Sequence, residues 1–339
     1  MAKIVGELTD DKIVQSFNTL GYSGVLYNKA TSNTPFLNLI GGNVKYTNST
    51  DFVCGQYYTG EDAVIPEISE TASLTAPQGS LVARSQITNT TQIFQESFGV
   101  SYAKQSNVGT LSGVNVAGQV ANPQNEIDFQ ASVKMDKIKK SIEKTFIQGT
   151  YNKATADTEV NKTRGMVAAI TTNVKAAGGA ALSLWTVNEV VEGIKNNGGD
   201  ISGLFLLANS TNLLQLNAEA IQLGYRVDMI EDTEYGISIQ RLLLPIGARI
   251  NLVLGEYIPS GTALIVNPAV CGPVEQPTPS KGNFFVEELA KVGAGSLYQI
   301  FGQIGLDHGP EWYHGKITGL STTFTPPVGM RVEMVEPSA

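Results

Sequence analysis

The sequence is short of charged side chains. Asp, Glu, Lys and Arg make up 16% of its 339 residues, whereas about 25% is usual for a soluble domain. Glycine, with 35 residues, and many Ser, Thr, Asn and Gln residues take their place. Hydrophobic residues make up 42%, which is enough for a core, so a wholly disordered chain is excluded. A polar surface of low charge suits extensive contact with other proteins.

Basic residues are scarcer than acidic ones. The sequence has 23 Lys and Arg residues and 31 Asp and Glu residues, which gives a net charge of −8. A protein that binds nucleic acid tightly needs a basic surface to neutralise the phosphates. The composition therefore argues against nucleic-acid binding as the function. Only two cysteines are present, Cys54 and Cys271. This small number excludes a disulfide scaffold and favours a reducing compartment.

Long hydrophobic runs are absent. The N-terminus reaches Lys3 and Glu7 before any apolar run, so we expect no signal peptide. A long uncharged stretch that is rich in apolar residues, residues 201–218, carries seven Ser, Thr, Asn or Gln residues. We therefore expect no membrane span.

Residues for catalysis are few. The only histidines are His308 and His314, and Pro310 between them prevents a helix that would bring both rings onto one face. No cysteine lies nearby in the sequence, so we expect this segment to be an ordinary strand or turn and not a metal site. Residues 309–316 resemble a phosphate-binding loop, but the spacing of the glycines is wrong and Ile317 stands where Ser or Thr is needed. We predict no catalytic residue, no cofactor, no metal and no enzymatic activity.

The first 80 residues show no sustained pattern beyond a short helix expected at residues 10–20. Proline and glycine interrupt the segment, and a polar segment this long rarely folds alone. We interpret residues 1–80 as an extended arm. Two alternatives stay open: the segment is a flexible terminus, or it is an arm that becomes ordered when it packs against neighbouring subunits.

Residues 81–123 change to a period of two. Phe94, Phe98 and Tyr102 share one parity, whereas Gln95 and Ser97 share the other. Such alternation predicts strands with one covered face. We interpret the segment as an extended β-ribbon, which is barely stable alone. We therefore expect the ribbon to pack against the core of its own chain or against another chain.

A long amphipathic helix is expected at residues 126–148. Apolar residues recur at steps of three and four: Ile127, Ala131, Met135, Ile138, Ile142 and Phe146. The opposite face holds Lys134, Lys137, Lys140 and Lys144. At about 1.5 Å per residue the helix would span roughly 35 Å.

The rest of the chain has an α/β pattern. A capping box at residues 186–189 (TVNE) predicts a helix that closes at Gly198 and Gly199. A short apolar strand at 203–208 and a helix at 211–223 follow. Further strands are expected at residues 225–230, 237–245, 250–254, 263–266, 298–302 and 315–324.

This order of elements resembles the major capsid proteins of tailed double-stranded DNA bacteriophages, which have the Hong Kong 97-type fold. Specific segments carry the resemblance: residues 34–40 (TPFLNLI), 88–98 (TNTTQIFQESF) with Val100 and Ser101, Arg164 to Met166, Tyr235 and Gly236, Gly302 and Gln303, Gly305 and Leu306, and 314–320 (HGKITGL). Two departures stand out. The turn at Tyr235 and Gly236 lacks an aromatic residue that these capsid proteins often have there. Residues 271–283 are interpreted as an insertion relative to these proteins, and the sequence does not assign them to a part of the fold.

The resemblance implies an α+β, Hong Kong 97-like capsid fold. Its parts would be an N-terminal arm at 1–80, an extended β-loop at 81–123, a peripheral domain with the spine helix 126–148, and an axial α/β domain. The peripheral domain would comprise residues 124–200 and 296–339, and the axial domain mainly 201–295. The implied function is a major capsid protein that self-assembles into the icosahedral head shell of a tailed bacteriophage around double-stranded DNA.

The resemblance also implies partners and an interface. The partners would be further copies of the chain, as hexamers and pentamers, with scaffolding, portal and decoration proteins and packaged DNA bound without sequence specificity. No membrane would be involved, and the protein would reside in the virion after assembly in the host cytoplasm. We expect Phe94, Phe98 and Tyr102 to pack on a neighbouring subunit and Lys137, Lys140 and Lys144 to face across a subunit boundary. The alternative is that the aromatic residues pack within their own chain and the lysines are merely solvated.

Two other functions remain open at this point. An encapsulin-like nanocompartment shell would share the fold but enclose cargo enzymes instead of a genome. A soluble α/β enzyme would instead show a concave pocket with titratable groups and would form only a small oligomer.

Overall fold

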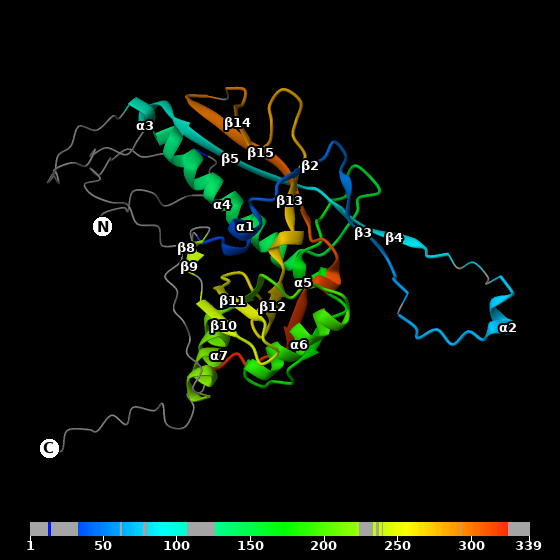
Figure 1. The fold of residues 1–339 in the computed structure, drawn as a ribbon. Helices are drawn as coiled ribbons and strands as arrows, with labels where there is room; N and C mark the ends of the chain where they lie inside the picture. The colour runs from blue at the N-terminus through cyan, green and yellow to red at the C-terminus, as the bar shows by residue number, and fades with distance from the viewer. Residues whose placement is uncertain are drawn as a thin grey trace, which may run out of the picture.

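A computed structural model describes residues 33–61, 63–76, 79, 81–106, 126–223, 240–291 and 293–324, with the residue pairs 13–14, 233–234 and 237–238. Two mixed sheets of six strands each form the body, and a two-stranded ribbon projects from it (Figure 1). None of the helices in these segments is long and apolar enough to cross a membrane.

The first sheet is built around one long strand. The strand β15 (Gly295–Asp307) pairs antiparallel with β5 (Gln92–Ser101), β13 (Gly272–Glu275) and β14 (Phe285–Glu288). The short strands β1 (Ile13–Val14) and β2 (Lys45–Tyr46) add in parallel to β5 and β13. Residues 13–14 are thus a strand where a helix was predicted, and the rest of residues 10–20 lies outside the described segments.

Helix α4 (Glu126–Gln148) covers one face of this sheet, with the bounds that its periodicity predicts. Ile138, Ile142 and Phe146 are almost fully buried against the even-numbered residues of β5 and the core residues of β15. The odd-numbered Ile93, Gln95 and Ser97 of β5 lie on the exposed face. The expected alternation therefore exists in β5, because one side of the strand is covered by α4.

The second sheet has the order β10-β11-β7-β12-β16-β6, and its central strands β7 and β12 are buried on both faces. Its strands are β6 (Val174–Ala176), β7 (Leu204–Ala208), β10 (Gln240–Leu243), β11 (Arg249–Leu254), β12 (Ala263–Val266) and β16 (Gly315–Thr318). Leu204 and Leu206 pack with α6 (Leu184–Asn196) and α7 (Ser210–Gln222), whereas Phe205 and Leu207 face the other core. Burial on both faces explains why β7 is an uninterrupted apolar run.

The N-cap of helix α6 lies three residues before Thr186, the residue at which the predicted capping box begins. Its N-cap is Ser183, whose hydroxyl accepts a hydrogen bond from the backbone N–H of Thr186 at 3.1 Å. The hydroxyl of Ser183 also lies 2.8 Å from that of Thr186. The helix ends as predicted, because Gly198 takes a φ of +80° just after the last turn.

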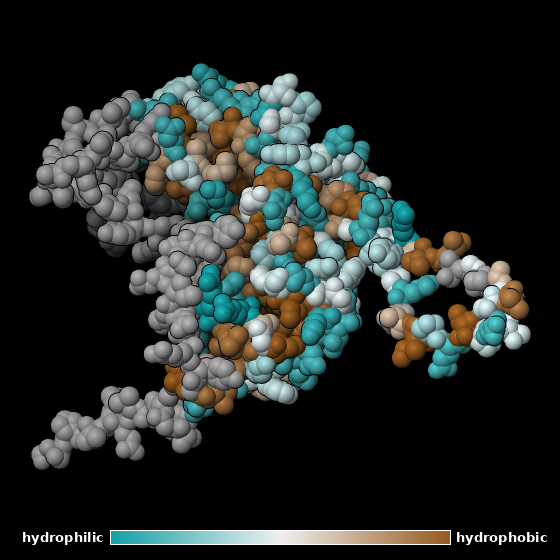
Figure 2. Space-filling model, viewed as in Figure 1, coloured by the Kyte–Doolittle hydropathy of each residue, from teal (hydrophilic) through white to brown (hydrophobic). Residues whose placement is uncertain are grey.

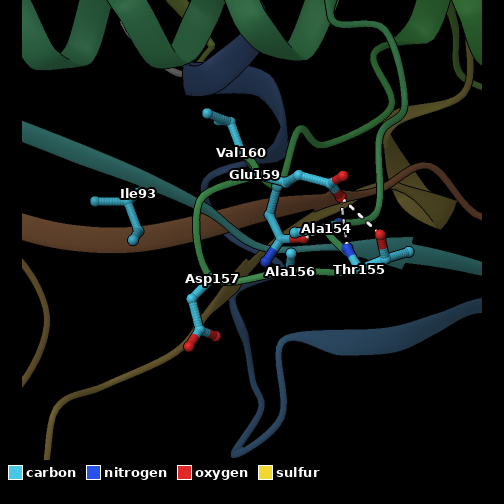
Figure 3. A pocket seen from close by; sticks show the side chains of 8 residues that line it. Ile93, Ala154, Thr155, Ala156, Asp157, Glu159 and Val160 are labelled. Carbon is cyan, nitrogen blue, oxygen red and sulfur yellow. Dashed lines mark hydrogen bonds between the residues drawn. The ribbon is translucent and has the colours of Figure 1, made fainter.

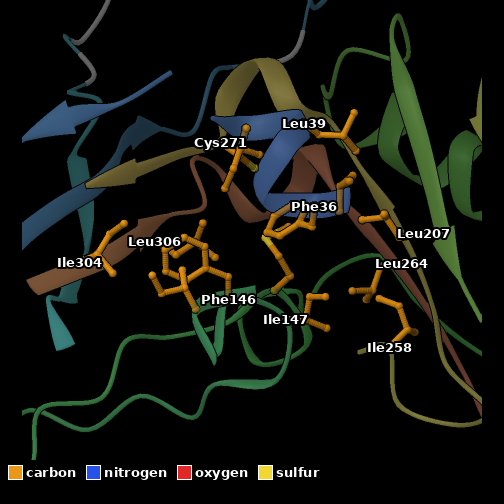
Figure 4. Close-up of a cluster of buried hydrophobic side chains, with 14 of the residues drawn as sticks. Phe36, Leu39, Phe146, Ile147, Leu207, Ile258, Leu264, Cys271, Ile304 and Leu306 are labelled. Atoms are coloured by element: carbon orange, nitrogen blue, oxygen red, sulfur yellow. The ribbon is translucent and has the colours of Figure 1, made fainter. Parts of the chain in front are cut away.

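The short helix α1 (Pro35–Ile40) belongs to the core, although it lies within the segment 1–80 that was interpreted as an extended arm. Phe36 and Ile40 are fully buried, and Leu39 is 5% exposed. Figure 4 shows Phe36 close to Phe146 of α4, with Leu207 and Leu264 of the second sheet nearby. The apolar residues of the TPFLNLI segment thus fill the space where the two sheets and α4 meet.

The projecting ribbon is also not where the sequence pattern placed it. It consists of β3 (Asp51–Tyr58) and β4 (Arg84–Thr90), which pair antiparallel, and the short helix α2 (Glu70–Ser73) lies in the loop between them (Figure 1). Strand β5, at the centre of the predicted 81–123 ribbon, belongs to the first sheet instead. Residues 107–125 lie outside the described segments.

Sheet membership also crosses the expected domain boundaries. Strands β13 and β14 fall within residues 201–295 but pair in the first sheet with β15. Helix α6 and strand β6 fall within residues 124–200 but pack in the second sheet's layer. The segment 271–283 includes β13, which lies between β15 and β2 in the first sheet, and continues into a turn closed by the bridge between Thr278 and Gly282.

Candidate assembly surfaces

The root of the ribbon is fixed to the body by side chains of β3. The ring of Phe52 fills the space beside Gly305, where a Cβ would lie 2.7 Å from the ring. The Cys54 thiol points at the carbonyl of Leu306 at 3.6 Å, and the Tyr57 ring meets Trp312 edge-on, with the ring centres 5.1 Å apart. These contacts fix the direction in which the ribbon leaves the body.

Asn89 of β4 is the polar centre of this attachment. It is fully buried, and its amide donates to the carbonyls of Leu306 at 2.8 Å and Arg164 at 3.2 Å. Its side-chain oxygen accepts from the N–H groups of Arg164 at 2.7 Å and Thr90 at 2.9 Å. One side chain therefore joins the ribbon, β15 and the segment after α4, which gives a physical reason for an asparagine in the TNTT motif.

The distal half of the ribbon is apolar and uncovered by its own chain. Figure 2 shows hydrophobic residues on the projecting part, which stands clear of the body. The most exposed apolar side chains there, between 70% and 101% exposed, are Val64, Ile65, Ile68, Leu74 and Leu81. Apolar residues gathered on a projecting element are typical of a surface that another protein covers.

The three aromatic residues predicted for the interface divide into two groups. Phe94 and Phe98 are 8% and 3% exposed and lie in the core under α4, where Phe98 stacks on Tyr298 with ring centres 5.3 Å apart. The alternative of packing within the chain therefore holds for these two, because little of either ring is left for a neighbour. Tyr102 is 43% exposed and keeps a face that a neighbour can reach.

The lysines of α4 lie on its outward side but are only partly free. Lys134 and Lys137 both pair with Glu96 of β5. Burial acts to raise the pKa of Glu96, but the two lysines outweigh this effect and lower it. Lys140 pairs with Asp136 one turn earlier at 2.7 Å. Lys144 is exposed and makes no ion pair with another described residue.

A buried carboxylate that the sequence reading missed joins α1 to α4. Glu143 is fully buried, and its two oxygens accept from the backbone N–H of Phe36 at 2.9 Å and of Leu37 at 2.6 Å. Burial raises its pKa to about 7, although the two N–H donors act in the opposite direction. Thr34, the N-cap of α1, makes no side-chain cap, so Glu143 takes that role. The only sequence signal was an acid next to the apolar stripe of the helix.

The two histidines are buried in a turn after β15. His314 accepts from the N–H of Asn267 through Nδ1 at 3.2 Å, and its Nε2 lies 2.8 Å from the carbonyl of His308. Burial lowers the pKa of His314 to about 4. The Sγ of Cys271 lies 3.7 Å from that Nε2, although the two residues are 43 apart in sequence. Among the described residues, no group of three or more His, Cys, Asp or Glu is arranged to hold a metal ion.

A cavity of about 560 Å³ lies between Ile93 and the loop formed by residues 154–161 (Figure 3). The carboxylate of Glu159 accepts hydrogen bonds from the backbone N–H of Thr155 at 2.7 Å and from its hydroxyl at 2.9 Å. These bonds lower the pKa of Glu159. The carboxylate holds its own loop closed, so its role in this cavity is structural.

Two sheets, a long covering helix and a projecting ribbon define a class of protein, the Hong Kong 97-type shell proteins. The structure is similar to the capsid of cyanophage A-1(L), with a TM-score of 0.62 and 12% identity over 90% of this chain and 98% of that one. It also matches a structure from Mycobacterium phage Patience, with a TM-score of 0.54 and 12% identity over 86% and 85% of the two chains. The SrpI encapsulin of Synechococcus elongatus matches with a TM-score of 0.57 and 11% identity over 88% and 95%.

The family within this class follows from the sequence. The family model of the SU10 major capsid protein matches residues 10–321. The chain belongs to this family and is a major capsid protein, a structural component of the virion that forms a multimeric shell. No curated protein matches the sequence significantly. The encapsulin shares the fold, and the family match favours the viral capsid.

Proposed function

We propose that copies of this major capsid protein assemble with one another, through hexamers and pentamers, into the icosahedral head shell of a tailed bacteriophage. The observation that carries the proposal is the uncovered apolar surface of the ribbon between β3 and β4, which a second copy would cover. A two-stranded ribbon is marginal alone in water, so burial against a neighbour would stabilise it. Repetition of one contact around closed symmetry gives a ring or a shell.

The shell would enclose double-stranded DNA without binding its sequence. A net charge of −8 disfavours tight phosphate contacts, which leaves packaged DNA free to slide during filling. The protein would have no enzymatic activity. It would assemble in the host cytoplasm, with portal, scaffolding and decoration proteins as further partners.

Electron microscopy of the purified protein tests the proposal. Closed polyhedral particles are the expected result, and particles isolated from infected cells should contain DNA and not a protein cargo. The variant I65S/L74S should keep the circular dichroism and the unfolding temperature of the parent, because both side chains are 85% exposed in the monomer. It should assemble poorly, since two apolar contacts are lost.

The matched control for this experiment is I65V/L74M, which changes the same positions but keeps them apolar. This variant should assemble like the parent. A protein that stays a small oligomer under all conditions, or an I65S/L74S variant that assembles normally, would show that the ribbon is not an assembly surface.

A further inference from the structure

The turn between β15 and β16, residues 308–314, supports the root of the projecting ribbon. The ring of Trp312 in this turn meets the ring of Tyr57 in β3 edge-on, with the ring centres 5.1 Å apart. Two residues closer to the body, a Cβ added to Gly55 would lie 3.6 Å from a backbone atom of Gly309. The two backbones therefore lie side by side, and the direction of the ribbon depends on the shape of the turn.

Strand β3 is irregular at the same place. Its pairing with β4 shifts between Val53 and Gly55, so Cys54 is an extra residue in the ladder. Such a β-bulge bends a strand locally. The Cys54 side chain is 4% exposed and points at the body. A reagent can therefore reach this thiol only when the root of the ribbon moves away from the turn.

The surroundings of His314 hold its ring in the neutral form. The ring is fully buried, and its Nδ1 accepts a hydrogen bond from the backbone N–H of Asn267 at 3.2 Å. Its Nε2 lies 2.8 Å from the carbonyl oxygen of His308 and therefore donates to it. A second proton could bind only at Nδ1, where it would meet the N–H of Asn267. Protonation of His314 therefore breaks a hydrogen bond that holds the turn.

His308 has no acceptor for a second proton. Its side chain is buried, and its Nδ1 donates to the carbonyl oxygen of Gly309 at 2.8 Å. Its Nε2 is buried and has no hydrogen-bond partner among the residues that the structure describes. A proton on this nitrogen would place a positive charge in the interior without an acceptor, which is costly. The closed turn is thus incompatible with protonation of either histidine.

Two carboxylates and one cation act on His308 from three elements: Asp307 of β15, Glu311 of the turn itself and Arg164 of the segment after α4. Burial and Arg164 lower the pKa of His308, whereas both carboxylates act in the opposite direction. The carboxylates already have other partners, which are Lys45 for Asp307 and the backbone N–H groups of Thr171 and Thr172 for Glu311. Burial raises the pKa of the two neighbouring thiols, so neither supplies charge in acidic solution: Cys54 and Cys271.

We propose that the turn is a pH-sensitive clamp, which opens when His308 and His314 are protonated and frees the root of the ribbon to change direction. The β-bulge at Cys54 is then the hinge. Burial lowers the pKa of His314 from 6.5 to about 4 and also lowers that of His308. The clamp is therefore fully closed above pH 6.5 and opens as the pH falls towards 4. This inference rests on the proposed function, because it names a condition that controls the assembly surface.

Modification of Cys54 by a pyridyl disulfide, which reacts with thiols in acidic solution, tests the clamp on unassembled protein. Peptide mass spectrometry identifies the modified cysteine, and the urea-unfolded chain at the same pH gives the reference rate. Between pH 6.5 and 4 the relative rate for Cys54 should rise roughly tenfold or more, since one unit of pKa depression corresponds to a factor of ten in the opening equilibrium.

The fluorescence of Trp312 gives a second readout. Trp185 is the only other tryptophan and is 65% exposed, so the variant W185F leaves Trp312 as the single reporter. Its emission should change over the same pH interval as the modification rate, because the ring loses its contact with Tyr57. The far-UV circular dichroism should stay constant, since only the turn and the root of the ribbon open.

The variant H308N/H314Q removes both titratable rings, while the Asn and Gln amides can still donate to the two carbonyls. Its Cys54 rate and its fluorescence should keep their neutral values down to pH 4. The matched control is E311Q, which removes a carboxylate of the same turn but keeps both histidines, so it should open at the same pH as the parent. If the double variant does not fold at pH 7, H308N alone serves, and it should open at a lower pH than the parent.

A folded parent protein in which Cys54 stays protected down to pH 4 overturns the inference, and so does a histidine variant that opens at the same pH as the parent. Loss of the circular dichroism together with the modification also overturns it, because the whole body and not the turn would then unfold. The assay needs no assembly. A parent protein that never forms shells refutes the proposed function alone, and a clamp that never opens leaves self-assembly standing.

Discussion

The carboxylate of Glu143 accepts a hydrogen bond from the backbone N–H of Phe36, which lies 107 residues earlier in the chain. Together with the bond from Leu37, this contact fixes the start of α1 on the long helix α4. A charged group is thus buried at the junction of the two sheets. Two donors at a helix N-terminus offset part of the cost of burying its negative charge, although burial still raises its pKa.

Stability should depend on pH through Glu143. Its pKa is raised from the ordinary value of 4.5 to about 7 by burial, so folding takes up a proton between these values. The stabilising contribution is complete below about pH 4.5 and is lost as the pH rises through 7, by at most about 1.4 kcal/mol per pH unit. Urea unfolding of the monomer from pH 4.5 to 8 should show this fall in the parent and not in E143Q. An identical slope in both proteins would contradict the assignment.

His314 should act in the opposite direction at lower pH. Burial lowers its pKa from 6.5 to about 4, so the unfolded chain binds more protons between these values. The contribution of neutral His314 is present above pH 6.5 and is lost as the pH falls towards 4. Its ring faces His308, Cys271 and Asn267, and Glu311 acts on it weakly from nearby.

The variant His314→Gln should therefore lose less stability than the parent between pH 6.5 and 4, although it should be less stable at pH 7. Thermal unfolding at a series of pH values measures both effects. Parallel curves for the two proteins would show that another group carries the acid sensitivity.

Gly149 should not tolerate a side chain. A Cβ at this position would lie 2.5 Å from the carbonyl oxygen of Thr145 and 2.6 Å from that of Thr163. The backbone nitrogen of Gly165 would lie 3.3 Å from the added Cβ, and its N–H donates a hydrogen bond to the Gly149 carbonyl at 2.9 Å. Gly149→Ala should cost roughly 1–3 kcal/mol in unfolding free energy. Gly60→Ala is the matched control, because nothing lies within 4 Å of its added Cβ.

Asn89 should be irreplaceable even by the similar Asp. Its amide donates to the carbonyls of Leu306 and Arg164, and an Asp carboxylate at this position would face both oxygens without a proton to donate. N89D should destabilise the monomer by about 3 kcal/mol or more, since it buries an unpaired charge. Denaturant unfolding measures the loss, and N89D with the stability of the parent would contradict the four-bond arrangement.

The elements with strong periodicity could be predicted from the sequence. The bounds of α4 were correct because one face is apolar over six turns, and β7 was found because it is short, apolar and flanked by polar residues. The ribbon was misplaced because the fully buried residues of β3 and β4 are few and mostly polar (Cys54, Asn89 and Thr90), so no run of alternating apolar residues marks the two strands. Phe94 and Phe98 were read as interface residues because alternation shows a covered face and does not show what covers it.

The buried polar groups needed the tertiary structure. Glu143 lies beside an apolar stripe in the sequence, but its partners Phe36 and Leu37 are more than a hundred residues away. Asn89 joins residues 75 and 217 positions distant. Local pattern carries no information on such pairs, because each partner is an ordinary backbone group until the chain has folded.

The sequence alone determined the amphipathic helix, the apolar strands and the low charge, since these depend on residue types at fixed spacing. Only the tertiary structure decided that α1 lies in the core, that β5 belongs to a sheet and that the apolar residues of the ribbon loop stand uncovered. Burial is a property of what surrounds a residue in space, and segments far apart in the chain supply those surroundings.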